Sequence, residues 1–226
     1  DDIDKLVYDI MTKYSKNGQE SHTTWDHKKI LKIFFRWLKL GFRNFQDVGN
    51  PPETDKVKMK SVKNKIIREQ LLTDDDLVLL LKSSRNQRDK AMISVAYESG
   101  CRPGELLSLK VKHVKIDQYG AMLSVDGKTG ARNIRIVKSV PHLMQWIDVH
   151  PWKNNPNAPL WPVINAGKRF GKPMDSATWR HQLQDTIYRS GISKRIFPNL
   201  FRHTAATNAA NYMTESQLRK RQGWTS

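Results

Sequence analysis

The sequence predicts a mainly α fold with one small antiparallel sheet (α+β), divided between two domains. Apolar residues recur at helical spacing over most of the 226 residues. Three short β-prone runs lie together in one stretch, and a glycine-flanked turn separates the last two. A proline pair and a basic run divide a helical N-terminal part from the remainder. Strands and helices do not alternate and no glycine-rich nucleotide loop is present, so βαβ units are not expected.

Residues 1–62 are expected to form a helical domain. Apolar residues at helical spacing predict a first helix around residues 6–14. A second helix is expected from Thr23 or Thr24, either of which could cap it, to about Gly41.

The second helix has two distinct faces. One face carries an apolar stripe formed by Ile30, Phe34, Trp37 and Gly41. The other carries a cationic stripe formed by Lys28, Lys32, Arg36, Lys39 and Arg43. We expect the apolar stripe to pack on its own domain and the cationic stripe to contact nucleic-acid phosphates. A solvated lysine face without such a partner is the alternative.

A basic linker is expected over residues 63–72. Pro51 and Pro52 end the helical pattern. The cations that follow, with no acid after Asp55, are Lys56, Lys58, Lys60, Lys63, Lys65 and Arg68. Such a run can lie along a nucleic-acid backbone. Thr73 and the three aspartates after it then mark a helix start, so the second domain is expected to cover residues 73–226.

The second domain is expected to hold the sheet and most of the helices. A helix over about 87–99 is stopped by Gly100, and Pro103 suits the first position of a short helix. The expected strands are 111–116, 121–125 and 133–137, with a turn at 127–130. Further helices are expected near 141, over 175–189, over 199–212 and over 214–223.

Composition points to a polyanionic partner. The formal net charge is +17, with an excess of six cations in residues 1–68 and eleven in the remainder. A basic tail is thereby excluded, and both domains are expected to touch one polyanion. A generally basic surface, as in some thermophiles, is the alternative. The sequence has no apolar run of the ~18 residues that a membrane span needs. Cys101 is the only cysteine, which favours a reducing compartment.

Three cations stand at turns rather than on helix flanks. Arg102 follows a helix, Lys128 lies at a hairpin tip, and Arg202 lies in the first turn of a helix rich in small residues. Two guanidiniums could hold the oxygens of one phosphodiester, and an ammonium could protonate a leaving alkoxide. Each cation alone also has an ordinary structural interpretation.

The order of the motifs is more specific than any one of them. The segments "SGCRPGELLSLK" (99–110), "DGKTGARNIRI", and "PNLFRHTAATNAA" followed by "LRKRQGW" stand in that order. Together, over roughly residues 70–226, they resemble the catalytic domain of tyrosine recombinases, the phage-integrase family, and especially the integrases of archaeal mobile elements. Residues 1–60 fit the core-binding domain of that family by position and charge.

The resemblance implies a role for each motif residue. Arg102 is similar to the first catalytic arginine of the family, and Glu105 to its acidic partner. Lys128 is similar to the hairpin lysine, the general acid toward the 5′-oxygen. Arg202 is similar to the second arginine. Trp224 occupies the position of a histidine or tryptophan that donates to the phosphate.

Two departures from the family pattern stand out. Asn199 occupies the place of a histidine three residues before Arg202, and an amide can donate a hydrogen bond but cannot exchange protons near neutral pH. The nucleophilic tyrosine of the family lies several residues beyond the position of Trp224, where this chain has only Thr225 and Ser226. Tyr212 precedes Trp224 and is rejected as the nucleophile.

His203, beside the second arginine, is expected to be structural. The chain begins at Asp1 rather than at a methionine, so we expect a clipped fragment that ends before the nucleophile and binds DNA without cleaving it.

The implied function is site-specific DNA recombination through a 3′-phosphotyrosyl intermediate, without a metal ion or other cofactor. The expected partner is double-stranded DNA at a recombination site, with a homotetramer in the synaptic complex and a monomer for this fragment. The expected location is the cytoplasm, with the DNA, or the host cytoplasm for a viral element. A catalytically degenerate DNA-binding or architectural protein and a type IB topoisomerase-like nicking-closing enzyme are the alternatives.

Overall fold

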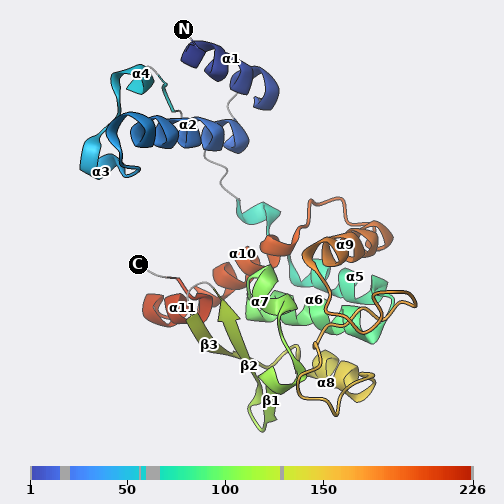
Figure 1. Ribbon diagram of the computed structural model, residues 1–226. Coiled ribbons are helices and arrows are strands. Elements are labelled where there is room, and N and C mark those ends of the chain that lie inside the picture. Colours follow the sequence, from blue (N-terminus) through green and yellow to red (C-terminus); the bar gives the residue numbers. More distant parts are fainter. Residues whose placement is uncertain (1, 16–20, 56, 60–66, 128–129, 225–226) are drawn as a thin grey trace. The chain divides into compact units, whose positions relative to one another are not determined.

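The computed structural model describes residues 2–15, 21–55, 57–59, 67–127 and 130–224. It contains two compact units, Asp1–Lys65 and Ile66–Ser226 (Figure 1). Helices predominate, and the strands form one three-stranded antiparallel sheet, which confirms the predicted fold class. Among the described residues, no helix is both long enough and apolar enough to cross a membrane.

The first unit consists of helices. They are α1 (Asp2–Tyr14), α2 (His22–Leu40), α3 (Phe45–Val48) and α4 (Pro52–Asp55). The α2 helix begins slightly earlier than expected, because the side chain of Ser21, and not Thr23 or Thr24, accepts the capping bond from the Thr24 N–H. It ends at Gly41, whose φ of 75° is the left-handed conformation that glycine adopts most easily.

The two faces of α2 are used differently from our expectation. The apolar stripe remains on the surface, with Ile30 63% exposed and Trp37 48% exposed. Lys28 is only 5% exposed, and its Nζ donates to the carbonyl oxygen of Lys58. The expected packing of the apolar stripe within its own unit is therefore wrong for the described residues. A lysine stem can cover apolar surface while its ammonium reaches a carbonyl, which is how Lys28 is buried.

Two further residues of the cationic stripe, Arg36 and Lys39, contact the segment that contains α3 and α4. Arg36 donates from Nε to the Asn50 side chain and from Nη1 to the Arg43 carbonyl oxygen. Lys39 forms an ion pair with Glu53, with 3.1 Å between Nζ and Oε1. Lys32 is half-buried, whereas Lys39 and Arg43 are exposed. The stripe is therefore not a continuous exposed cationic surface. Of the linker cations, Lys58 is exposed, and Lys60, Lys63 and Lys65 lie outside the described residues.

The second unit combines the sheet with most of the helices. The α-helices are α5 (Asp74–Ser83), α6 (Gln87–Ser99), α7 (Pro103–Leu107), α8 (Val140–Asp148), α9 (Ser176–Ser190), α10 (Pro198–Ala209) and α11 (Glu215–Gln222). The short 3-10 turns are η1 (Arg68–Gln70) and η2 (Val111–His113), and the strands are β1 (Val114–Asp117), β2 (Gly120–Gly127) and β3 (Gly130–Ile136).

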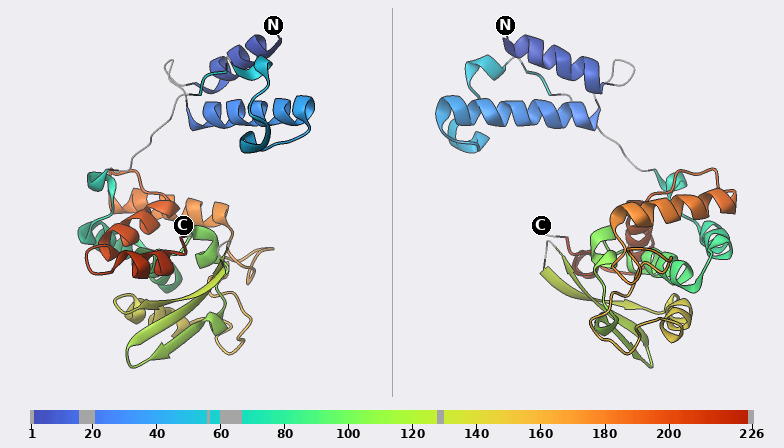
Figure 2. Two further views of the ribbon diagram at one scale, coloured as in Figure 1. Left: turned by 90° about the vertical axis from the view of Figure 1, so that its left-hand side faces the viewer. Right: turned by 45° about the vertical axis from the view of Figure 1, so that its right-hand side comes forward.

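The sheet is an antiparallel meander in the order β1-β2-β3. Leu123 of β2 lies opposite Val114 on one side and Ile134 on the other. Figures 1 and 2 show the sheet at one end of the unit, away from α5 and α9. The β1 strand begins later than expected, because the chain first forms the η2 turn, in which His113 Nδ1 accepts from the Lys110 N–H.

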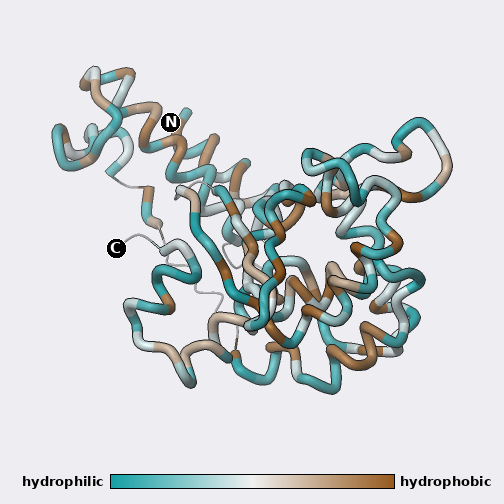
Figure 3. Tube along the Cα trace, turned by 90° about the horizontal axis from the view of Figure 1, so that it is seen from below, coloured by the Kyte–Doolittle hydropathy of each residue, from teal (hydrophilic) through white to brown (hydrophobic). Residues whose placement is uncertain are grey.

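The core of this unit lies between α6 and the helices and strands around it. Five of the apolar side chains of α6 are at most 3% exposed: Ala91, Met92, Ile93, Val95 and Ala96. The inward residues of β2 and β3, such as Leu123 and Ile134, are equally buried. The trace in Figure 3 changes repeatedly between hydrophilic and hydrophobic colours along the helices, as expected for helices with one buried face.

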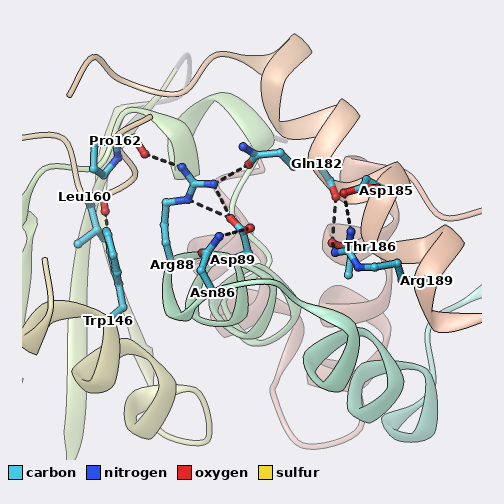
Figure 4. A network of polar contacts seen from close by, with 10 residues as sticks. All are labelled: Asn86, Arg88, Asp89, Trp146, Leu160, Pro162, Gln182, Asp185, Thr186 and Arg189. Atoms are coloured by element: carbon cyan, nitrogen blue, oxygen red, sulfur yellow. Dashed lines mark hydrogen bonds and ion pairs between the residues drawn. The ribbon is translucent and has the colours of Figure 1, made fainter. Parts of the chain in front are cut away.

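A buried arginine joins α6 to α9 (Figure 4). The Arg88 side chain is 1% exposed, and its Nη1 donates to the carbonyl oxygen of Pro162 at 2.7 Å. Its Nε and Nη2 donate to Asp89, and Nη2 also donates to Gln182 of α9. The buried charge is thus paired and hydrogen-bonded, as a charge in a core must be.

We expect Arg88→Met to lower the free energy of unfolding by about 3 kcal/mol, because it leaves the Pro162 carbonyl and the Gln182 amide without their donor. Arg85→Met is the matched control. The Arg85 side chain is 66% exposed in its ion pair with Asp185, and such pairs contribute less than about 1 kcal/mol. Urea denaturation followed by tryptophan fluorescence measures both values, and equal losses would contradict this account.

Candidate active site

A glycine turn positions Arg102. The α6 helix ends at Gly100 in the left-handed conformation, with φ of 62°, and α7 begins at Pro103. A Cβ atom at residue 100 would stand 2.8 Å from the Cβ of Ala205 in α10, so only glycine fits both the conformation and the space. This close approach brings the Arg102 turn next to α10, which carries Arg202.

Glu105 is the acidic centre of the site. Its carboxylate accepts from the backbone N–H and from Nη1 of Arg102, each at 2.8 Å. It also accepts from Nη1 and Nη2 of Arg132, at 3.0 and 2.7 Å. The residue is only 4% exposed. Burial alone raises the pKa of the Glu105 carboxyl, but the hydrogen bonds from Arg132 and Arg102 outweigh it and hold the pKa at about 2.

Gly127, the last residue of β2 before the hairpin turn, packs directly on this carboxylate. A Cβ atom at Gly127 would collide with Oε1 of Glu105, so a glycine is required there for close approach rather than for an unusual φ. Gly130, across the hairpin, has a φ of 91°. Lys128, which we expected at the tip, lies outside the described residues.

Three guanidiniums converge on the C-terminal end of α11, and we call Arg102, Arg132 and Arg202 the arginine cluster. Arg132 Nε donates to the Arg221 carbonyl oxygen, Arg202 Nη2 to that of Gln222, and Arg102 Nη2 to that of Gly223. These three carbonyls are consecutive. They belong to the end of the helix where carbonyls lack intrahelical donors and the dipole is negative, which favours cations.

Arg202 is held between two elements. Its Nη1 donates to the carbonyl oxygen of Gly100 at 2.9 Å while its Nη2 reaches α11. Burial lowers the pKa of Arg202 to about 10, with a further contribution from the positive charge of Arg102, so it stays protonated at neutral pH. Arg202 is the fifth residue of α10, because the helix begins at Pro198, and not in the first turn as expected.

Trp224 follows the three carbonyls. Its backbone N–H donates to the carbonyl oxygen of Arg219, which closes the end of α11, and its side chain is partly exposed. The side chain of Gln222, in contrast, is fully buried, and neither its Nε2 nor its Oε1 has a hydrogen-bond partner within the described residues.

The remaining predicted residues lie around this centre. Asn199 is exposed in the first turn of α10, and His203 is exposed one residue beyond Arg202, outside the buried core. Tyr212 is 70% exposed and lines a separate cleft with residues of α5, α6 and α10. In the described part of the chain, no group of three or more His, Cys, Asp or Glu side chains is arranged to hold a metal ion.

The sequence analysis did not identify Arg132 as a site residue. It selected only Lys128 from the motif that contains both residues. Arg132 is in phase with Ile134 and Ile136, whose side chains are buried. Alternation along β3 therefore directs Arg132 toward the same side as the apolar residues. A charged residue at an inward position of a strand is the signal that could have identified it.

Comparison with known proteins shows which family and which proteins this chain is similar to. Residues 70–226 match the model of the phage integrase family. A tyrosine recombinase XerD of Pseudomonas putida is 27% identical over 217 residues, covering 92% of this chain and 68% of that protein. A tyrosine recombinase XerC of Chlamydia pneumoniae is 27% identical over 125 residues, which are 54% of this chain and only 38% of that protein.

Solved structures share the fold. The crystal structure of XerA recombinase matches with a TM-score of 0.60 at 22% identity, covering 100% of this chain and 74% of that one. A Tn1549 transposon integrase in complex with a circular intermediate DNA has a TM-score of 0.71 at 18% identity, with coverages of 100% and 77%. A lambda integrase tetramer bound to a Holliday junction has a TM-score of 0.67 at 16% identity, with coverages of 98% and 64%.

We expect the Glu105 carboxylate to make the stability of the second unit dependent on acid pH. Its pKa is about 2 in the folded chain and about 4.5 when unfolded, so its contribution is complete above pH 4.5 and is lost as the pH falls toward 2. The loss should reach about 3 kcal/mol. Urea denaturation between pH 7 and pH 2.5 measures it.

Glu105→Gln should be less stable at pH 7 and should lack this part of the pH dependence, because an amide does not titrate. Glu215→Gln is the control, since Glu215 forms only an exposed ion pair with Arg219. An unchanged pH dependence in Glu105→Gln would show that other carboxyls cause the acid sensitivity.

Proposed function

The chain belongs to the phage integrase family of tyrosine recombinases, and from this premise we propose that it binds duplex DNA and holds one phosphodiester at the arginine cluster. The observation that carries the proposal is the convergence of Arg102 and Arg202, from two different elements, on adjacent carbonyls of α11. Groups that already gather around partial negative charge can also receive a phosphate.

In the proposed site, Arg102 and Arg202 contact the non-bridging oxygens and stabilise the charge that develops at phosphorus. The indole N–H of Trp224 and the amide of Asn199 donate further hydrogen bonds. Glu105 keeps Arg102 in position. These roles agree with the exposure of the groups, because Arg102 is 32% exposed beside a fully buried acid.

The proposed reaction is a transesterification. A tyrosine oxygen attacks phosphorus, the bond from phosphorus to the 5′-oxygen breaks, and a 3′-phosphotyrosyl bond forms. Lys128 gives its proton to the departing 5′-oxygen. No tyrosine follows Trp224 in the 226 residues, so we propose that the attacking tyrosine is not one of them.

The basic character of both units supports the DNA partner, since the net charge of +17 is divided between them. We assign residues 1–62 to a core-binding domain, 63–72 to a linker and 73–226 to the catalytic domain. The proposed phosphate contacts outside the site are Lys28, Lys32, Arg36, Lys39, Arg43, Lys58, Lys60, Lys63 and Lys65. Lys28 would need to leave its buried position to take part. The structural neighbours that were solved with DNA support DNA as the partner.

Recombination in a homotetramer, on DNA in the cytoplasm, completes the proposal. The lambda integrase tetramer bound to a Holliday junction, which shares this fold, supports it by analogy. A DNA-binding protein without catalytic activity is a second candidate, favoured by Asn199, which cannot replace a histidine in proton transfer. If a longer natural form of the chain carries a tyrosine after Trp224, that form separates the two, since only a recombinase would form a covalent adduct with DNA.

We expect the 226-residue chain to bind a 30-base-pair duplex with strong salt dependence. Neutralising about six phosphates gives a slope near −5 in a plot of log K against log salt concentration. Fluorescence anisotropy between 50 and 300 mM NaCl measures the slope. Arg43→Gln should reduce the magnitude of the slope by about one. Arg85→Gln, which removes a cation paired with Asp185, should leave the slope unchanged. A slope near −1 would refute binding by several phosphate contacts.

We expect no covalent adduct between this chain and a nicked suicide duplex, because Tyr212 lines a cleft whose other residues do not belong to the arginine cluster. Denaturing gel electrophoresis after incubation checks for a slower protein band. A band that disappears in Tyr212→Phe would identify Tyr212 as the nucleophile and would overturn our assignment.

A further inference from the structure

Arg132 occupies the junction of three segments that are distant in sequence. It lies on β3 opposite Val125 of β2, and its side chain is only 8% exposed. Its three nitrogens are all engaged, two with the Glu105 carboxylate and one with the Arg221 carbonyl oxygen. The hairpin, the Arg102 turn and the end of α11 are therefore joined through one guanidinium.

The contact with Glu105 affects Arg102 directly. The same carboxylate that accepts two bonds from Arg132 accepts the backbone N–H and Nη1 of Arg102. Without Arg132, a buried carboxylate would retain a single cationic partner, and its position would be less constrained. Arg132 thus determines where Glu105 lies, and Glu105 determines where the Arg102 guanidinium lies.

The contact with α11 affects the turn that carries Trp224. Arg132 Nε holds the Arg221 carbonyl, and the Arg221 side chain in return donates from Nη1 to the Arg135 carbonyl of β3. The two arginines connect β3 and α11 in both directions. The next two carbonyls in the chain, those of Gln222 and Gly223, accept hydrogen bonds from Arg202 and Arg102. By fixing the Arg221 carbonyl, Arg132 therefore also fixes the position of the adjacent turn.

We propose that Arg132 is a positioning residue that sets Arg102 and the Trp224 turn for the phosphodiester. This inference rests on the proposed function. Arg132 is not itself a ligand of the phosphate, because its side chain is four times less exposed than that of Arg102 and each of its nitrogens already donates. A lysine could not replace it, since one ammonium cannot make the planar two-point contact with a carboxylate and also reach a carbonyl.

Titration of the native chain and Arg132→Lys with inorganic phosphate at pH 7 tests the inference. Nuclear magnetic resonance follows the Arg102 Nε–H and the Trp224 indole N–H. In the native chain both signals should shift with one Kd. In Arg132→Lys the Kd should rise at least tenfold, and the two signals should no longer change together. Arg135→Lys is the matched control on the same strand, since Arg135 forms an exposed ion pair with Asp117.

A second measurement distinguishes positioning from general destabilisation. Carboxyl-carbon titration of Glu105 in the absence of phosphate should show a higher pKa in Arg132→Lys than in the native chain and an unchanged pKa in Arg135→Lys. Should Arg132→Lys fail to fold, Glu105→Asp takes its place, because the shorter side chain withdraws the carboxylate from Arg132, and also from the Arg102 side chain, while all the charges remain. It should weaken phosphate binding by a similar factor.

The outcomes separate the two proposals. If the native chain shows no phosphate-dependent shift at Arg102 and Trp224, the proposed function fails at this site. If the native chain binds phosphate and Arg132→Lys, or Glu105→Asp where it is needed, binds with the native Kd, the positioning role of Arg132 is overturned and the proposed function stands.

Discussion

The buried charge of Glu105 is the constraint on which the site depends. A carboxylate that is 4% exposed must be surrounded by donors, because an unpaired ion inside a protein is expensive. The chain meets this demand with donors from the start of α7 and from β3, and it leaves no side chain at Gly127, where one would intrude. The need to compensate one acid therefore determines how closely the hairpin, the α6–α7 turn and the cluster approach one another.

The same chemistry explains how three cations can lie close together. Arg102, Arg132 and Arg202 repel one another, and the lowered pKa of Arg202 reflects its burial first and this repulsion second. One carboxylate and three consecutive carbonyls at the negative end of α11 offset it. The arrangement leaves Arg102 partly exposed and Arg132 enclosed, so chemically identical side chains have different capacities for an external anion.

Local signals predicted the framework well, whereas long-range partners could not be predicted. The stop of α6 at Gly100 and the start of α7 at Pro103 depend on neighbouring residues, and they were confirmed. The packing of the apolar face of α2 was predicted wrongly, because periodicity identifies an apolar stripe but not what covers it. Arg132 was overlooked for a related reason. Its partners lie 27 and 89 positions away in the chain.

The buried side-chain amide of Gln222 lowers the stability of the end of α11. A buried amide without partners costs about 1–3 kcal/mol, and here guanidiniums bind the backbone carbonyls of Gln222 and of the residues on either side of it. Two of these guanidiniums, those of Arg102 and Arg202, are the groups that the proposed phosphate would engage. If the proposed phosphate binds there, its binding and the docking of this last helical turn are linked equilibria, and each changes the free energy of the other by the same amount. The stability of the end of α11 would then rise or fall with the anion bound beside it.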